Sequence, residues 1–204
     1  MRPMSRTAPR STHHHGNLRQ ALIQAGIDLL EEGGISALTL RKCAVRAGVS
    51  HAAPAHHFDG LSGLKSAIAE EAFERFSTYL QTARDAGEQT DAGRLRSVCR
   101  GYLQFGIDHS GILNVIFGQL GLASLKPGNR ETAHAYLILR GVCAPFVTAP
   151  MDPRVVEIRV WSLIHGFTLL AMSGEFNDAD RSLDMDLFDA VMDVLPQIAT
   201  PNAS

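Results

Sequence analysis

The chain has few cysteines, and their spacing excludes the sites that cysteines usually build. Among 204 residues there are three, Cys43, Cys99 and Cys143, with no CxxC spacing. An odd number of widely separated cysteines argues against a disulfide framework and against a structural zinc site. We therefore expect three buried free thiols and neither a bound metal nor a cofactor.

Long apolar runs are also missing. No stretch of about 18 uncharged apolar residues occurs, which is the length that a membrane-spanning helix needs. The first 16 residues are rich in Arg, Pro, Ser, Thr and His and lack the apolar region of a signal peptide. These absences predict a cytoplasmic protein without a membrane partner, and 45% apolar residues suffice for a globular core.

The motifs of common enzyme classes are absent as well. The chain has no Ser or Cys nucleophile elbow, no Gly-rich phosphate loop and no paired-carboxylate motif. Six of the nine histidines lie before residue 58, which leaves a metal-dependent hydrolase as an alternative. However, His51, His56 and His57 do not have the spacing of three or four that places two imidazoles on one helical face. The sequence thus gives an enzyme little support.

Charge is distributed unevenly along the chain. Residues 1–58 carry seven lysines and arginines against three acids, a net charge of +4, whereas residues 59–204 carry twelve against eighteen, a net charge of −6. A basic segment beside an acidic remainder is typical of a protein that meets phosphates at one end. The acidic remainder argues against a ligand-free protein that coats DNA, because coating requires a broadly basic surface.

Apolar residues recur with helical spacing through most of the chain. A first helix is predicted from Asn17, as its N-cap, to Glu32, with Gly33 and Gly34 ending it. Residues 62–83 predict a long helix with an apolar residue at every fourth position. Because no period-2 strand pattern competes, we expect an all-α fold of about nine helices. The remaining predicted helices are 94–109, 112–122, 130–144, 154–173 and 183–199.

One short stretch indicates what the basic end does. Residues 37–58 read as two helices joined by a tight turn, in which Ala44 is small enough for a close helix crossing. Gly48, four residues later, permits a positive φ. Thr39 is suited to cap the first of the two helices and Ser50 the second. Such a helix-turn-helix places its second helix in the major groove of DNA.

Three phrases in a fixed order give the chain a family resemblance. They are His14-His15-Gly16-Asn17-Leu18-Arg19, the turn Ala44-xxx-Gly48-Val49-Ser50 continued by His51-Ala52-Ala53-Pro54, and Trp161-Ser-Leu-Ile-His165-Gly166. Together they resemble the TetR family of one-component transcription regulators, in a subgroup whose C-terminal half bears a Trp-His-Gly motif. The resemblance runs from residue 14 to about 195.

The resemblance implies a two-domain regulator. It implies a DNA-binding domain at 17–60, a ligand-binding and dimerisation domain at 61–199 and a tail at 200–204. Composition predicts that residues 1–16 form a disordered basic arm. Family members bind palindromic operators as dimers, and a small molecule usually releases the DNA, so the expected function is a ligand-responsive repressor.

By resemblance, residues 50–57 form the recognition helix. The family often has a Tyr and a Lys as phosphate contacts where this chain has Ala55 and Leu61, so other residues must hold the DNA backbone. Each lost phosphate contact flattens the salt dependence of binding by about one unit of slope. Pro54 deletes a hydrogen bond to Ser50 and is expected to stiffen or shift the helix start. The predicted DNA-binding residues are Thr39, Arg41, Lys42, Arg46, Ser50, His51, Ala52, Ala53, His56, His57 and Lys65.

A pocket is expected where apolar helices converge with a few polar groups among them. Trp161 and His165 are one helical turn apart on such a helix, although both also fit ordinary core positions, the histidine with a backbone carbonyl as partner. The predicted effector is a largely apolar small molecule. The predicted ligand-binding residues are Leu103, Ile107, Ile116, Phe117, Tyr136, Arg140, Trp161 and His165.

The last two predicted helices carry the expected dimer contact. Residues 160–173 contain no Lys, Arg, Asp or Glu and are apolar nearly all round, so both sides of that helix must be covered. Residues 183–199 add a second apolar stripe, with aspartates left for solvent. We therefore expect a C2 homodimer, whose symmetry matches a palindromic operator. The predicted interface residues are Leu163, Phe167, Leu170, Leu187, Phe188, Val191 and Leu195.

Overall fold

The computed structural model describes residues 13–118, 134–174 and 183–195, with side chains from Leu18 onward. Within these ranges the regular elements are eight α-helices and three short 3-10 segments, so the predicted all-α class is confirmed. The ends of the helices predicted at 112–122, 130–144 and 183–199 lie partly outside the described residues, as do residues 1–12 of the predicted arm and the tail at 200–204.

The chain divides into two compact units, Met1–Ile68 and Ala69–Ser204, which we call the N-terminal and the C-terminal unit. The division falls inside helix α3 (Gly60–Ala86), whereas the sequence places the domain boundary at residue 60. The other elements of the N-terminal unit are α1 (His13–Gly33), η1 (Ile35–Ala37), α2 (Leu40–Arg46) and η2 (Ala53–His56).

Two glycines shape helix α1. Gly34 adopts φ 63° directly after the helix, and its N–H donates to the Leu30 carbonyl at 2.9 Å, so the predicted stop is confirmed. At Gly26 a Cβ atom would lie 2.4 Å from Cδ1 of Ile68, so a larger residue here would require the Ile68 side chain to shift. The helix begins at His13, before the predicted Asn17.

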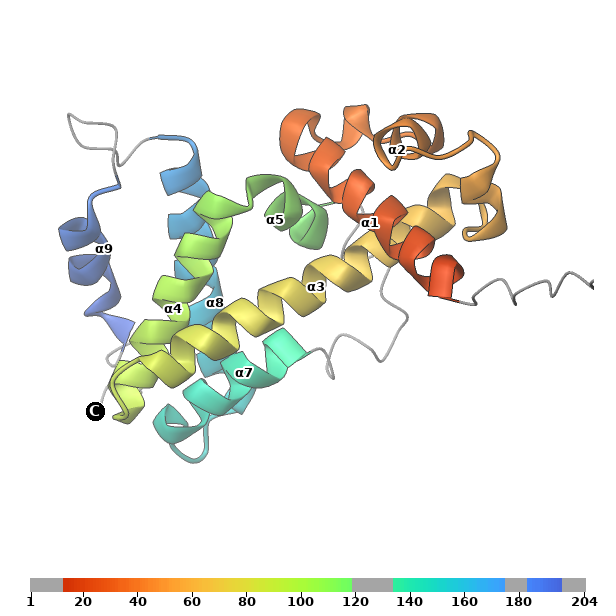
Figure 1. Ribbon diagram of the computed structural model, residues 1–204. Helices are drawn as coiled ribbons and strands as arrows, with labels where there is room; N and C mark the ends of the chain where they lie inside the picture. Colours follow the sequence, from red (N-terminus) through yellow and green to blue (C-terminus); the bar gives the residue numbers. More distant parts are fainter. Residues whose placement is uncertain (1–12, 119–133, 175–182, 196–204) are drawn as a thin grey trace, which may run out of the picture. The chain divides into compact units, whose positions relative to one another are not determined.

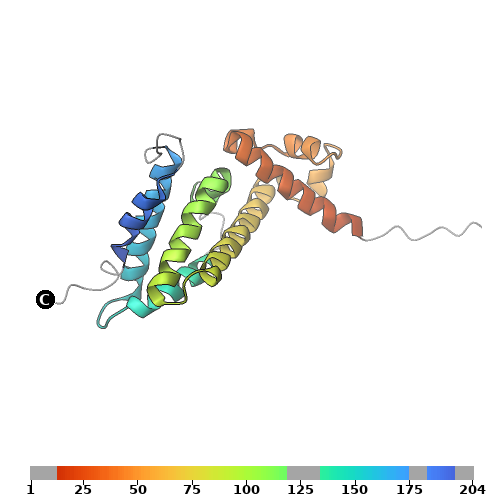
Figure 2. The ribbon, with the colours of Figure 1, turned by 60° about the vertical axis from the view of Figure 1, so that its left-hand side comes forward.

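The C-terminal unit is a helical bundle built around two neighbouring helices. Helices α4 (Asp91–Asp108) and α8 (Pro153–Met172) run side by side, and α7 (His134–Cys143) packs on both (Figures 1 and 2). The remaining elements are α5 (Ser110–Phe117), η3 (Ala144–Phe146) and α9 (Met185–Met192). Polar side chains cap three of these helices: Thr90 accepts from Gly93 N, Asp152 from Arg154 N and Asp184 from Leu187 N.

Helix α9 is fastened to α4 by an ionic cluster. The Arg100 guanidinium donates to both carboxylate oxygens of Asp189 at 2.7 Å, and Arg96 is hydrogen-bonded to Asp193. Arg100 also lies over the Phe188 ring, 5.8 Å from its centroid. The aspartates at 189 and 193, which the sequence assigns to solvent, therefore hold this helix in place.

Helix α8 is the one described helix that is long and apolar enough to cross a membrane by length and composition. It is not an uncharged run, because it carries Arg154, Glu157 and Arg159. Its residues Val156 and Ile164 are buried inside the C-terminal unit. A core helix of a helical bundle passes the same test of length and composition, so the observation is weak evidence for a membrane span.

Helix α8 also buries a hydroxyl without a hydrogen-bond partner among the described residues. Thr168 is fully buried and its Oγ1 is unsatisfied. Because an unsatisfied buried polar group costs about 1–3 kcal/mol, Thr168→Val should raise the free energy of unfolding by about 1 kcal/mol or more. Ser77→Ala is the control, since the hydroxyl of Ser77, which is also buried, donates to the Phe73 carbonyl at 2.7 Å and its loss should destabilise. Urea unfolding of the ligand-free chain measures both; destabilisation by Thr168→Val would contradict the assignment.

Candidate functional site

The turn of the helix-turn-helix has the geometry that the sequence predicts. Gly48 adopts φ 68°, and Ala44 is fully buried at the crossing. Val49 N donates to the Ala44 carbonyl at 2.9 Å and Gly48 N to the Val45 carbonyl at 3.1 Å. This pair of bonds is a Schellman motif, which closes the C-terminus of α2 and redirects the chain.

The start of α2 presents polar and basic side chains to solvent. Thr39 caps the helix, as predicted, by accepting from Lys42 N at 3.2 Å. Arg41 and Lys42 are exposed and form no ion pair with the side chains that the structure describes. They border an open depression of about 440 Å³ whose other lining residues are Leu29, Thr39, Val45 and Arg46.

The prediction of a recognition helix at residues 50–57 is wrong, because these residues do not form an α-helix. The structure has turns followed by the 3-10 segment η2, in which Ala53 N bonds the Ser50 carbonyl and Ala55 N bonds the Ala52 carbonyl. Pro54 lies at the start of this segment and has no N–H for the α-helical bond to Ser50. Ser50 is therefore not the predicted side-chain cap.

The side chains of the recognition segment differ in exposure. Ser50, His51, Ala52 and His56 are exposed, whereas Ala53 is half-buried. Two further predicted DNA contacts, His57 and Lys65, are also half-buried. The His57 ring is tilted against Phe58 with 6.5 Å between centroids, and the guanidinium carbon of Arg19 lies 5.4 Å from the centroid of the same phenyl ring. At the two positions where the family often has a Tyr and a Lys as phosphate contacts, Ala55 is exposed and Leu61 is half-buried.

Arg46, predicted to bind a phosphate, is engaged by a carboxylate of its own unit. Its Nη1 donates to Oε1 of Glu32 at 2.6 Å, and Nη2 donates to Oε2. The hydrogen bonds from Arg46 hold the pKa of the Glu32 carboxyl below its usual value. Because this pair is bidentate, the charge of Arg46 is largely compensated before DNA arrives. Arg41 and Lys42 are thus the better candidates for phosphate contacts.

Four aromatic side chains meet where α4, α5 and α8 converge. Three of them, Phe117, Trp161 and His165, belong to the predicted ligand set, and the fourth, Tyr102, was missed. Phe117 lies 4.8 Å from the His165 ring and 5.7 Å from Trp161, between centroids. The Tyr102 ring stacks on Phe117 at 5.9 Å. Tyr102 is buried, whereas the other three are half-buried.

A hydrogen bond of 2.8 Å joins the Tyr102 hydroxyl to Nδ1 of His165. Burial lowers the pKa of His165, so the imidazole is neutral near pH 7. Burial also raises the pKa of Tyr102, an effect that a hydrogen bond with Trp161 partly offsets, so the phenol keeps its proton. Nδ1 is the one acceptor at hydrogen-bond distance that the structure gives this hydroxyl, so we assign Tyr102 as the donor.

Two other predicted ligand residues, Tyr136 and Arg140, gather around a buried carboxylate instead. Glu157 on α8 is only 2% exposed. The Tyr136 hydroxyl donates to its Oε2, and the Arg140 Nε lies 3.6 Å from its Oε1. A lone Glu in an apolar helix is the signal that points to such a group. Leu103 and Ile116 are buried core residues, and Ile107 is exposed.

The buried carboxylate makes the Tyr136 hydroxyl important for stability. Tyr136→Phe removes the hydrogen bond to Glu157 and is expected to lower the free energy of unfolding by about 1–3 kcal/mol. Tyr79→Phe is the matched control, because the Tyr79 hydroxyl donates to the exposed Asp108 at 2.9 Å, where water replaces it. Denaturant unfolding monitored by circular dichroism distinguishes the two. If both variants lost the same free energy of unfolding, the burial of Glu157 would not require the hydrogen bond from Tyr136.

The predicted dimer residues divide into a buried and an accessible group. Phe167, Phe188 and Leu195 are buried inside the subunit, and the two phenyl rings meet at 5.6 Å, so these three are corrected to core residues. They fill the space between α8 and α9, which a partner cannot reach. Leu170 and Leu187 are exposed, and Leu163 and Val191 are half-buried.

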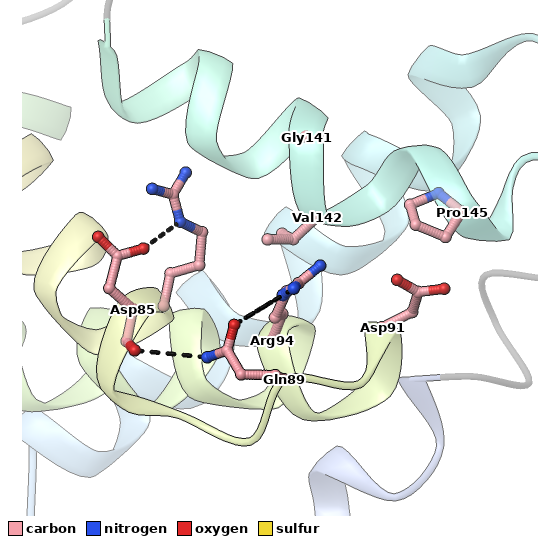
Figure 3. A pocket seen from close by; sticks show the side chains of 8 residues that line it. Asp85, Gln89, Asp91, Arg94, Gly141, Val142 and Pro145 are labelled. Atoms are coloured by element: carbon pink, nitrogen blue, oxygen red, sulfur yellow. Dashed lines mark hydrogen bonds and ion pairs between the residues drawn. The ribbon is translucent and has the colours of Figure 1, made fainter.

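A polar groove that no sequence pattern indicates lies at one end of the C-terminal unit (Figure 3). Its volume is about 350 Å³. In it Arg84 Nε bonds Asp85 at 2.9 Å and Arg94 Nη2 bonds the Gln89 amide oxygen at 3.2 Å. Asp91, Gly141, Val142 and Pro145 complete the lining. In the described ranges, no group of three or more His, Cys, Asp or Glu side chains could hold a metal ion.

Known proteins resemble both the C-terminal unit alone and the chain as a whole. Residues 95–195 match the family of tetracyclin repressor-like C-terminal domains. The whole chain is similar to an uncharacterized HTH-type transcriptional regulator of Mycobacterium tuberculosis, Rv0681, with 24% identity over 187 residues, which are 88% of this chain and 82% of the relative.

Solved structures share the fold over nearly the full length. A TetR family transcription regulator from Marinobacter aquaeolei is similar with a TM-score of 0.68 at 15% identity, over 92% of this chain and 98% of its own. The transcriptional regulator FadR from Bacillus subtilis, in complex with stearoyl-CoA, gives 0.66 at 17%, over 86% and 96%. These findings set aside the hydrolase alternative. The chain is a TetR-family helix-turn-helix transcriptional regulator with a tetracyclin repressor-like C-terminal domain, and not an enzyme.

Proposed function

We propose that the chain is a cytoplasmic repressor that binds a palindromic operator as a homodimer and releases it when a small molecule binds the C-terminal unit. The observation that carries the DNA-binding part is the exposed set Thr39, Arg41 and Lys42 on α2, whose two cations have no ion-pair partner among the described side chains. Unpaired cations beside a helix-turn-helix supply phosphate contacts, while Ser50 to Ala52 supply small side chains for close approach to the groove.

An exposed apolar stripe on α8 supports the homodimer. Val155, Ile158, Leu169 and Leu170 are all exposed. Val155, Ile158 and Leu169 share one face because steps of three and four residues connect them, and Leu170, next to Leu169, widens this face. Gly166 lies in the same stretch of α8, and no atom is within 4 Å of the position that a Cβ would take there. A large exposed apolar surface marks an interaction site, and a two-fold axis across this face would bury it twice.

The aromatic group of Tyr102, Phe117, Trp161 and His165 is the proposed effector site. It combines apolar rings with one polar histidine, as small-molecule sites commonly do. The FadR structure from Bacillus subtilis, in complex with stearoyl-CoA, shows that a similar fold holds an acyl compound. We therefore propose a largely apolar effector for this chain.

The test of the proposed function is operator binding in the presence of competitor. The full chain is titrated onto palindromes from the DNA upstream of its own gene, with a large excess of non-specific duplex. A repressor should stay bound to one of these palindromes despite the competitor, with two chains per duplex. Loss of all binding to the competitor would instead indicate a DNA-coating protein, whose affinity comes from phosphates alone.

A further inference from the structure

The histidine of the aromatic group is held in one hydrogen-bonding state. With Tyr102 assigned as the donor in its 2.8 Å hydrogen bond to Nδ1 of His165, the neutral imidazole carries its proton on Nε2. A neutral ring with that proton is a donor at Nε2 and has no second acceptor. The Tyr102 hydroxyl thus decides which kind of ligand atom His165 can bind.

Among the described residues, the rings that contact the imidazole carry no charge. The ring contacts that the structure gives His165 are to Tyr102 and Phe117, and Trp161 packs against Phe117 and is hydrogen-bonded to Tyr102. Segments 110–118 and 160–173, which supply Phe117, Trp161 and His165, contain no Lys, Arg, Asp or Glu. Helix α4, which supplies Tyr102, carries its nearest charges at the exposed Arg100 and Asp108. A charged ligand group would therefore lose part of its hydration without gaining a counter-ion from the side chains that contact the imidazole.

An unsatisfied polar group lies one turn away in the same helix contact. Tyr102 pairs with His165, and one turn further along both helices Gly106 faces Thr168, where a Cβ on Gly106 would come within 2.4 Å of the threonine Cγ2. The fully buried Thr168 Oγ1 has no partner among the described residues. The contact between α4 and α8 therefore has hydrogen-bonding capacity that the described side chains leave unused.

We propose that the effector presents a neutral hydrogen-bond acceptor, such as the carbonyl oxygen of a ketone, ester or thioester, to Nε2–H of His165. Its apolar remainder packs on Phe117 and Trp161. Tyr102 is a positioning residue, because it fixes the imidazole as a donor without touching the ligand oxygen. The inference rests on the proposed effector site and names its ligand class.

Three phenyl compounds of similar size test the proposal. Butyrophenone offers a carbonyl acceptor, butylbenzene offers no polar atom, and 1-phenylbutylamine offers a cationic donor. Their dissociation constants are measured on the full chain by titration calorimetry and by the emission of Trp161, the chain's one tryptophan. The decisive quantity is the preference for butyrophenone over butylbenzene, because this ratio cancels general effects on the pocket.

His165→Phe should reduce the preference for butyrophenone about fivefold to tenfold, since a net hydrogen bond is worth up to about 1.5 kcal/mol and each 1.4 kcal/mol is tenfold. His165→Gln, which keeps an amide donor near the Nε2 position, should restore most of it. An unchanged ratio in both variants would overturn the inference but leave the effector site standing. Failure of all three compounds to bind the wild-type chain would overturn the site as well.

Tyr102→Phe separates positioning from packing. It removes the donor to Nδ1, so the imidazole can place its proton there and offer a lone pair at Nε2. The preference for butyrophenone over 1-phenylbutylamine should then fall at least threefold. A purely structural role would weaken all three compounds by the same factor, and that result would contradict the proposal. Tyr79→Phe is the matched tyrosine control and should leave every ratio unchanged.

Discussion

Ile158→Asp is expected to convert the dimer into monomers and to abolish tight operator binding. Ile158 is 60% exposed in the subunit, so an aspartate there would be harmless if α8 faced water. In an isologous interface the substitution appears twice and buries two unpaired carboxylates. We expect the dimer dissociation constant to rise at least about a hundredfold, which corresponds to about 3 kcal/mol.

Sedimentation at micromolar concentration measures this change. Leu137→Asp is the control, because Leu137 is 42% exposed on α7 and does not belong to the stripe, so its replacement should leave the mass of a dimer. Circular dichroism of the Ile158→Asp chain should still show a helical fold. A helical Ile158→Asp chain that sediments as a dimer would place the subunit contact elsewhere.

Arg41→Ala and Lys42→Ala should each weaken operator binding about tenfold at physiological salt. Both cations are exposed and lack ion-pair partners among the described residues, so each can bind a phosphate without first breaking a contact. Each lost phosphate contact should also lower the slope of log affinity against log salt by about 0.9. Fluorescence anisotropy of a labelled operator at several salt concentrations measures both effects.

Arg46→Ala is the internal comparison for these two variants. Because its guanidinium is bound by Glu32, removal of Arg46 should change the salt slope by less than half as much. Glu32→Gln should then raise operator affinity, because it releases the arginine for DNA. A larger slope change for Arg46→Ala than for Arg41→Ala would show that DNA displaces Glu32 and would reverse the ranking.

The sequence predicted those features that depend on neighbouring residues. The helix stop at Gly34, the positive φ at Gly48 and the Thr39 cap are local properties of one or two turns. The ends of α4 and α8 lie within three residues of the predicted 94–109 and 154–173, because apolar periodicity and breaking residues mark them directly.

Contacts between distant segments were not predictable in the same way. The pairing of Arg46 with Glu32 depends on how α1 crosses α2, and periodicity alone does not place two polar side chains opposite each other. Apolar spacing likewise assigned Phe188 to a partner subunit, although it packs on Phe167 of its own chain. Pro54 was expected to shift the recognition helix, but its missing N–H yields a 3-10 segment in place of an α-helix.

Selection from random DNA shows whether the chain recognises a palindrome as a dimer. The full chain is incubated with a library of random duplexes, bound molecules are amplified through several rounds, and the mass of the final complex is determined. The account predicts enrichment of two inverted half-sites whose centres lie about one helical turn or a multiple of it apart, with two chains per site or a multiple of two. Recovery of sequences without a common motif, or of a single half-site bound by one chain, would contradict it.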